Sequence, residues 1–237
     1  MRNIDLLLLG EYIIYMKIYH GSINIIEKPI YGYGSPYNDY GLGFYCTKEK
    51  EKAMEWAVNY ELDGYANCYE LDLKGLRILN LNEKPYKILH WLALLIQNRT
   101  FKDKSPLVRE AKSYILKKFS IDCNDFDIIN GYRADDSYFS FARDFLQGTI
   151  SYRQLNNALK LGNLGEQVVL ISEKAFNSIK FLGAEIAYSK EWYLKKKERE
   201  DKARNDYFDE TKNHREKGDI FIHQIIDEQM EADDERL

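Results

Sequence analysis

The sequence predicts an α+β fold, and three observations support that class. The 237 residues suffice for one sizeable domain with an appendage, or for two small domains. Short apolar runs with strand-like alternation are spread over the first 190 residues. Longer stretches with helical spacing of apolar residues lie between them, and no internal repeat is present. We therefore expect strands and helices that pack together in one mixed core.

The expected strands begin near the N-terminus. The stretch KIYH (17–20) predicts a strand that runs into a turn at Gly21. A loop rich in glycine, proline and tyrosine follows at 27–43, and GFYCT (43–47) predicts the second strand. The remaining strands are expected at 66–73, at 76–81, at the start of 126–148 and at both ends of 166–189.

Helices are expected in four segments. The first spans 48–62, with Thr47 as its N-cap. Its apolar face is predicted to consist of Ala53, Trp56, Ala57 and Tyr60. Residues 84–119 carry helical patterns that break near Pro106. The third and fourth helices are expected in the later part of 126–148, capped by Asp135 or Asp136, and at 151–162, capped by Ser151 and ended by Gly162.

The N-terminal stretch LLLLGEYIIY lacks the features of a signal peptide. It has one positive charge ahead of it, Glu11 inside it and no small-residue cleavage site. It is also too short to span a bilayer. Two alternatives stay open: an additional N-terminal strand or helix, or a translation start at Met16 that makes residues 1–15 an optional lead-in.

The composition changes at about Ser189. Residues 190–217 are dense in charges of both signs and predict an exposed helix, docked by Trp192 and Tyr193. The segment after Gly218 carries an apolar stripe that requires a partner surface, in cis or in trans. The stripe consists of Ile220, Ile222 or His223, Ile226 and Met230. We divide the chain into a lead-in (1–15), a main domain (16–188) and a charged helical tail (189–237).

Charge and cysteine content restrict the class of protein. The net charge of -4 gives no global reason to expect tight nucleic-acid binding. The chain has an odd number of cysteines without metal-ligand spacing: Cys46, Cys68 and Cys123. We therefore expect reduced thiols in a cytoplasmic protein and no bound metal. Because the N-terminal apolar stretch is too short to span a bilayer, we also expect no membrane association. Tyrosine is unusually frequent, at 19 residues. Tyrosine rings serve cores, and they also line sites where rings stack on ligands.

Two glycine-containing motifs frame the tyrosine-rich loop. His20-Gly21-Ser22 follows the first strand, and the second motif, YGLGFY, runs from Tyr40 to Tyr45. This order resembles the NAD-binding half of the ADP-ribosyltransferase superfamily, in the branch shared by diphtheria-type toxins and poly(ADP-ribose) polymerases. Residues from about 17 to 205 also resemble a family of small, largely uncharacterised bacterial proteins in that clan. The segments 131–142 and 161–176 carry this second resemblance.

The resemblance implies a split β-sandwich core with helical insertions, and NAD as the substrate. His20 would bond the adenine-side ribose hydroxyl, because a neutral imidazole offers both a donor and an acceptor. Gly21 would let the backbone pair with the nicotinamide carboxamide, and Ser22 would add a hydroxyl contact. Tyr45 would stack on the nicotinamide ring, a contact worth about 0.5–1.5 kcal/mol beyond area burial.

The rest of the second motif and the loop before it are expected to complete the NAD pocket. Tyr40 and Gly43 belong to this expected binding set. The loop 31–40 would close over the site, and one of its tyrosines would supply a second stacking wall. The tyrosines of this loop are Tyr31, Tyr33, Tyr37 and Tyr40.

In this superfamily a glutamate at the start of a later strand stabilises the positive charge that develops on the ribose. The matching strand here is 165–171. The spacing of the family motif places Gln167 in that position, whereas the chemistry favours Glu166. Neighbouring strand residues face opposite sides, so only one of them points into the cleft. We favour Gln167 as the residue in the catalytic position and keep Glu166 as the alternative. A glutamine would remove the carboxylate base and would favour mono-transfer over polymer elongation.

The segment GYRADDS supplies Arg133, Asp135 and Asp136. One interpretation is a helix N-cap with a surface arginine. The other places Arg133 near a phosphate or the acceptor, with an aspartate able to deprotonate an acceptor group. We interpret His90 and Glu185 as structural.

The leading hypothesis is a mono-ADP-ribosyltransferase that modifies a macromolecule, either a protein or a nucleic acid. The resemblance implies a bacterial toxin of a toxin–antitoxin or phage-defence pair, and the tail would suit an antitoxin or self-association. Two alternatives stay open: an NAD glycohydrolase with water as acceptor, and a degenerate transferase fold that binds a nucleotide or a partner. A glutamine in the glutamate position favours the last of these.

Overall fold

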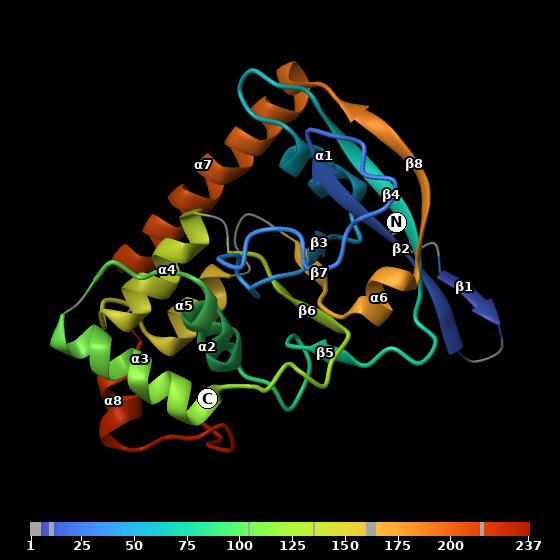
Figure 1. Cartoon of the computed structure of the whole chain (residues 1–237). Coiled ribbons are helices and arrows are strands. Elements are labelled where there is room, and N and C mark those ends of the chain that lie inside the picture. The colour runs from blue at the N-terminus through green and yellow to red at the C-terminus, as the bar shows by residue number, and fades with distance from the viewer. Residues whose placement is uncertain (1–5, 10–11, 104, 135, 160–164, 214–215) are drawn as a thin grey trace.

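The computed structural model describes residues 6–9, 12–103, 105–134, 136–159, 165–213 and 216–237. The described residues form a mixed α+β structure with two four-stranded sheets and eight helices (Figure 1), which confirms the predicted class. The strands are β1 (Leu6–Leu9), β2 (Tyr12–Ser22), β3 (Phe44–Cys46), β4 (Gly64–Asp72), β5 (Ile78–Asn80), β6 (Ile128–Tyr132), β7 (Glu166–Leu170) and β8 (Ile179–Ala187). The helices are α1 (Lys50–Ala57), α2 (Ile88–Asn98), α3 (Pro106–Phe119), α4 (Asp136–Leu146), α5 (Tyr152–Ala158), α6 (Glu173–Asn177), α7 (Ser189–Asn213) and α8 (Ile222–Asp227).

The first sheet has the strand order β1-β2-β4-β8, and the second has the order β3-β7-β6-β5. The only parallel neighbours are β5 and β6; the other described pairs are antiparallel. The two sheets share a core, because apolar side chains of both pack together. Ile18, Tyr69 and Leu71 come from the first sheet, and Phe44 and Val168 come from the second.

The two sheets meet where β2 passes β3. The backbone of Tyr19 and that of Thr47 exchange hydrogen bonds of 2.8 and 2.9 Å. His20 directly follows this bridge, and Tyr45 lies two residues before Thr47. The bridge therefore brings the ends of the two sequence motifs together at the junction of the sheets.

Helix α1 covers the first sheet at close range. A Cβ atom on Gly21 would lie 2.1 Å from the carbonyl oxygen of Ala53, and one on Gly64 would lie 2.1 Å from that of Ala57. Real Cβ atoms do not approach backbone oxygens so closely, so both glycines are required for this packing. Gly21 thus has a packing role in addition to the ligand role expected of it.

Helices α2, α3, α4, α5 and α8, with part of α7, build a second core against the other face of the β3-β7-β6-β5 sheet, whereas Ala175 and Phe176 of α6 belong to the core between the sheets. Helix α2 is apolar on nearly all sides, and Trp91, Leu92 and Leu95 are almost completely buried. Val169 of β7 and Ile129 of β6 belong to the same core. Figure 1 shows α2, α3, α4, α5 and α8 gathered together, away from β1, β2 and β8.

Several predicted boundaries change. Helix α1 ends at Ala57, so Tyr60, expected on its apolar face, lies beyond it and is exposed. The N-cap of α1 is Glu49, not Thr47; the Thr47 hydroxyl instead accepts a hydrogen bond from the Glu49 amide at 3.2 Å. The break near Pro106 is confirmed, because α3 begins at that residue.

Two other cap predictions can be followed in the structure. Ser151 caps α5 as predicted, since its hydroxyl accepts a hydrogen bond from the Gln154 amide. Helix α4 begins at Asp136, while Asp135 and Gly162 lie outside the described residues. At the N-terminus, Leu6–Leu9 pair antiparallel with β2 and form an additional strand, while the translation start at Met16 stays a prediction.

Helix α7 is less exposed than predicted. Trp192 and Tyr193 pack against the α1 core, as expected, but Ala203 and Tyr207 are also buried in the helical core. In Figure 1, α7 extends from the region near α1 to the region near α4. No helix within the described ranges is both long enough and apolar enough to cross a membrane.

The C-terminal apolar stripe finds its partner surface in cis. Ile222 and Met230 are buried in the helical core, where α8 packs against α3. His223 is exposed, which decides between the two alternatives for that position. Ile220 and Ile226 are half-buried against the same core, as predicted, and Ile225 is an additional, fully buried member of the stripe. The apolar stripe is therefore covered by the chain itself.

Candidate functional site

A cavity of about 970 Å³ opens at the junction of the two sheets. Its walls come from the end of β2, from β3 and β7, from the loop between β2 and β3, and from α7. This volume lies near the upper end of the range of about 300–1,000 Å³ that is typical of small-molecule sites. It suits a ligand of several linked ring systems.

The cavity brings most of the predicted site residues together. The predicted residues that line it are His20, Gly21, Gly43, Tyr45, Arg133 and Gln167. The predicted residues outside its lining are Ser22, Tyr40 and Glu166.

His20 is held in one orientation. Its Nδ1 lies 2.7 Å from the carbonyl oxygen of Tyr45, and its ring stacks on Phe44 with centroids 4.4 Å apart. A carbonyl oxygen can only accept, so Nδ1 carries the ring proton and Nε2 is left as an acceptor. Burial lowers the pKa of His20, which keeps the imidazole neutral near pH 7. The ring therefore offers the cavity a hydrogen-bond acceptor.

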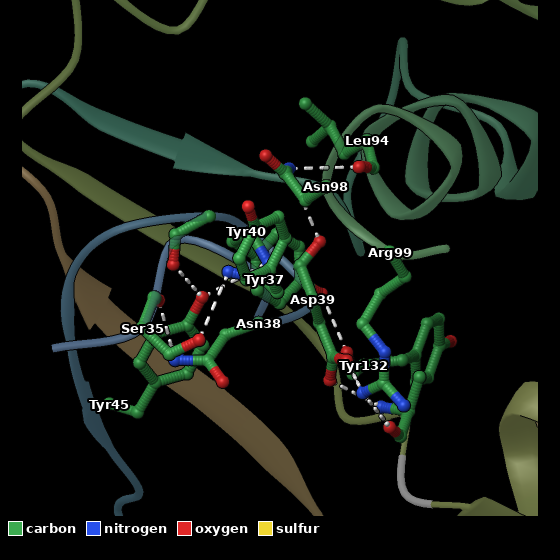
Figure 2. Close-up of polar contacts among 12 residues, drawn as sticks. Ser35, Tyr37, Asn38, Asp39, Tyr40, Tyr45, Leu94, Asn98, Arg99 and Tyr132 are labelled. Atoms are coloured by element: carbon green, nitrogen blue, oxygen red, sulfur yellow. Dashed lines mark hydrogen bonds and ion pairs between the residues drawn. The ribbon is translucent and has the colours of Figure 1, made fainter.

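The ring of Tyr45 is fixed by its own hydroxyl. The hydroxyl donates to the carbonyl of Gly41 at 2.6 Å and accepts from the backbone amide of Tyr40 at 3.1 Å. Burial raises the pKa of the Tyr45 phenol, so it stays protonated and can donate. The turn that carries Gly41 thus positions an aromatic ring in the cavity wall (Figure 2).

The structure distinguishes Gln167 from Glu166. Gln167 is 6% exposed and lines the cavity, whereas Glu166 is exposed and lies 3.9 Å from Lys48 on the surface. The side-chain oxygen of Gln167 is buried and has no hydrogen-bond partner among the described residues. A buried carbonyl without a partner is costly, so this oxygen suits a ligand that donates a hydrogen bond.

Ser22 and Tyr40 have other partners. The Ser22 hydroxyl donates to the Asn24 carbonyl and accepts from Asn67 at 3.1 Å, within the turn after β2. The ring of Tyr40 is buried in the helical core, and its hydroxyl donates to the Tyr132 carbonyl at 2.6 Å. Tyr40 supports the cavity wall from behind.

Arg133 lies over the ring of Trp56, with its guanidinium carbon 4.3 Å from the ring centroid, and both residues line the cavity. This cation–π contact places a fixed positive charge in the wall. Asp135 and the side chain of Asp136 lie outside the described part of the chain, so their expected role as a base stays a prediction.

The ion pair between Asp39 and Arg99 was not predicted from the sequence. The Asp39 carboxylate is 5% exposed and accepts from Arg99 Nη1 at 2.9 Å and from the Ala134 amide at 2.8 Å. Burial raises the pKa of Asp39, although the Ala134 amide and Arg99 oppose that shift. Figure 2 shows how these bonds attach the loop to the end of α2. The partners are 60 residues apart in sequence, so no local pattern reveals them.

Asn67 of β4 is a second supporting residue that the sequence analysis missed. Its amide nitrogen donates to the carbonyls of His20 and Asn24, and its oxygen accepts from the Ile26 amide at 2.9 Å. Asn67 therefore fixes the start of the loop next to His20. The available signal was a polar residue at a buried position of an alternating strand.

Comparison with known proteins gives one match. The model of a family described as a protein of unknown function, DUF3990, matches residues 16–181. The chain belongs to the DUF3990 family. No curated protein and no solved structure matches it. His20, Tyr45 and Gln167 all lie inside the DUF3990 match.

Helix α7 follows the DUF3990 match and still forms part of the cavity wall. The lining residues that it contributes are Tyr193, Lys196, Glu200 and Arg204. The helix is attached to α1 by a buried ion pair, in which Arg199 Nε lies 2.7 Å from Glu55 Oε2. This part of the wall was not predicted, because a charge-rich helix is typical of a fully solvated face.

The charges of the cavity wall favour an anionic ligand. The basic lining residues are Lys28, Arg99, Arg133, Lys196 and Arg204, and the acidic ones are Asp39 and Glu200. Five positive and two negative groups leave a net charge of +3, although the whole chain carries -4. Together with the aromatic wall and the Gln167 oxygen, this suits a ligand that combines rings, hydroxyls and phosphates.

Proposed function

We propose that this DUF3990 protein is an NAD-dependent mono-ADP-ribosyltransferase that transfers ADP-ribose to a macromolecule. One observation carries the proposal. His20, Tyr45 and Gln167 come from β2, β3 and β7, hence from both sheets, and line one cavity. They are the residues that the resemblance names for NAD binding and cleavage. Two sheets that share a core and meet at the Tyr19–Thr47 bridge support the split β-sandwich that the resemblance implies.

Each group has a place in the binding of NAD. The Tyr45 ring stacks on the nicotinamide, and the Nε2 atom of His20 accepts from a ribose hydroxyl. The basic residues of the wall, including Arg133 and Arg204, complement the pyrophosphate. The Gln167 oxygen accepts from a hydroxyl of the nicotinamide ribose. Its partial negative charge then faces the carbon on which positive charge develops.

The reaction breaks the bond between the nicotinamide nitrogen and the ribose carbon. The bonding electron pair goes to nicotinamide, which leaves as a neutral molecule. A nucleophile of the acceptor then bonds to the ribose carbon and releases a proton. Gln167 is an amide and cannot take up that proton, so another base or the solvent receives it. This favours a single transfer over chain elongation.

The test is incubation of the protein with NAD that is labelled in its adenylate phosphate. We expect nicotinamide release together with label on a macromolecule. Label found only as free ADP-ribose indicates a glycohydrolase instead. NAD binding without nicotinamide release indicates the degenerate fold and overturns the proposal.

Substitution of Tyr45 tests the site itself. Tyr45→Ala removes the stacking ring, so we expect loss of nicotinamide release. Tyr45→Phe keeps the ring and removes only the hydroxyl bonds, so most of the activity should remain. The exposed Tyr188, outside the cavity, serves as the matched control as Tyr188→Ala. Circular dichroism verifies the fold of each variant, and full turnover in a folded Tyr45→Ala protein would falsify the assigned site.

A further inference from the structure

Exposed apolar side chains gather in the loop between β2 and β3. The loop residues of this kind are Ile23, Ile25, Ile30, Tyr31, Tyr33, Tyr37 and Leu42. Their exposed fractions run from 41% for Leu42 to 79% for Tyr33. Ile30 and Tyr33 line the cavity and are largely exposed, and Tyr37 directly precedes the lining residue Asn38, so these members of the cluster lie at or beside the cavity mouth. A concentration of exposed apolar groups beside a cavity indicates a binding surface.

The most exposed members of this cluster are aromatic rings. Tyr33 and Tyr37 are 79% and 71% exposed, and neither ring contacts another aromatic ring among the described residues. Tyr31, at 52%, meets the edge of Phe176. Planar rings that are open to solvent on a loop are suited to stack on other planar groups.

Two lysines line the same cavity as Tyr33. Lys28 comes from the same loop and Lys196 from α7, and both line the cavity. Neither forms an ion pair within the part of the chain that the structure describes. The chain as a whole is acidic, so this basic surface is local. Protein–protein interfaces are depleted in lysine, whereas lysine and tyrosine together are typical of surfaces that bind single-stranded nucleic acid.

We propose that the cavity mouth binds a single-stranded nucleic acid, with Tyr33 and Tyr37 stacked on unpaired bases and Lys28 and Lys196 beside phosphates. A duplex hides the faces of its bases, so a single strand fits the rings better. The identification of this strand as the ADP-ribose acceptor rests on the proposed function. The binding of the strand is independent of the proposed function.

The test measures fluorescence anisotropy of labelled 12-nucleotide DNA and RNA strands of mixed sequence, at low salt and without NAD. We expect single strands to bind at least tenfold more tightly than the duplex of the same sequence. The double variant Tyr33→Ala/Tyr37→Ala should weaken single-strand binding at least tenfold, because each lost stacking contact reduces affinity substantially. Tyr188→Ala, in an exposed tyrosine outside the loop, is the matched control and should bind like the unmodified protein.

The lysines are tested through salt dependence. In Lys28→Ala/Lys196→Ala, the slope of log affinity against log salt should fall by about 1.4, because two phosphate contacts are removed from a single strand. Lys197→Ala removes an exposed α7 lysine that does not line the cavity, and should leave the slope unchanged.

The two proposals fail in distinguishable ways. Absence of single-strand binding, or an equal loss in the control variants, overturns the nucleic-acid site. If nicotinamide is released and only protein becomes labelled, without strand binding, the nucleic-acid site is overturned and the transferase proposal stands. Strand binding without nicotinamide release supports the nucleic-acid site and removes the transferase.

Discussion

In the cavity wall, the side chain of Gln167 contrasts with that of His20, which lines the same cavity. The His20 ring is fixed by the Tyr45 carbonyl and by Phe44, whereas the Gln167 oxygen has no partner among the described residues. Leaving a buried acceptor without a donor costs about 1–3 kcal/mol. A ligand hydroxyl that reaches this oxygen recovers that free energy on binding. The Gln167 oxygen is therefore suited to recognise a ligand that donates a hydrogen bond.

The two adjacent side chains at the start of β7 should differ sharply in function. Gln167→Met keeps the length of the side chain and removes its hydrogen bonding, so we expect nicotinamide release to fall by about 100-fold. Glu166→Gln removes an exposed charge near Lys48 and should change release by less than about twofold. Steady-state nicotinamide release measures both variants. Equal effects, or a larger effect at Glu166, would reverse the assignment of the two positions.

At the scale of elements, ion pairs position two parts of the cavity wall, the β2–β3 loop and α7. The loop is attached to α2 through Asp39 and Arg99, and α7 is attached to α1 through Glu55 and Arg199. Both pairs are largely buried, so each needs its partner to offset desolvation. The geometry of the cavity thus depends on contacts between elements that are far apart in sequence.

Removal of one partner of the α7 pair should destabilise the protein. Arg199→Met leaves the Glu55 carboxylate buried without that partner, so we expect the free energy of unfolding to fall by about 3–5 kcal/mol. Glu55→Gln/Arg199→Met removes both charges of this pair, but it also takes the Glu55 carboxylate from the buried Lys52, 4.0 Å away, so it should recover only part of that loss. Lys195→Met breaks the exposed Lys195–Glu191 pair on the same helix, and should cost at most about 0.5 kcal/mol. Urea unfolding provides the comparison, and equal losses in the two single variants would contradict the importance of the buried pair.

At the scale of the whole molecule, the C-terminal segment belongs to the helical core. Ile222 and Ile225 are fully buried, and the Tyr114 hydroxyl donates to the Met230 carbonyl at 2.9 Å. The end of the chain is therefore part of the same packed unit as α2 and α3.

This arrangement predicts that damage to the C-terminal stripe weakens the entire protein. Ile222→Ala should lower the free energy of unfolding by about 2–5 kcal/mol, within a single cooperative transition. The control His223→Ala changes an exposed neighbour and should have little effect. A separate early transition in the Ile222→Ala protein would show that the C-terminal segment unfolds on its own.

The sequence predicted those features that depend on neighbours in the chain. The strand at 17–20, the Ser151 cap and the break at Pro106 follow from alternation, capping and proline chemistry. Pairing between residues that are far apart in the sequence could not be predicted in this way. Asp39 gives no local sign of Arg99, and the α7 wall depends on a helix whose composition indicates solvent exposure. The choice between Glu166 and Gln167 likewise required the structure, because it depends on which face of β7 borders the cavity.

The junction of the sheets has a consequence for the length of the β2–β3 loop. The Tyr19–Thr47 bridge and the His20–Tyr45 hydrogen bond hold the two ends of this loop together. For a flexible loop whose ends are already held, doubling its length adds only about 0.6 kcal/mol of closure entropy. The surface-facing middle of the loop can therefore lengthen or shorten at small thermodynamic cost, while the histidine and tyrosine at its ends keep their positions.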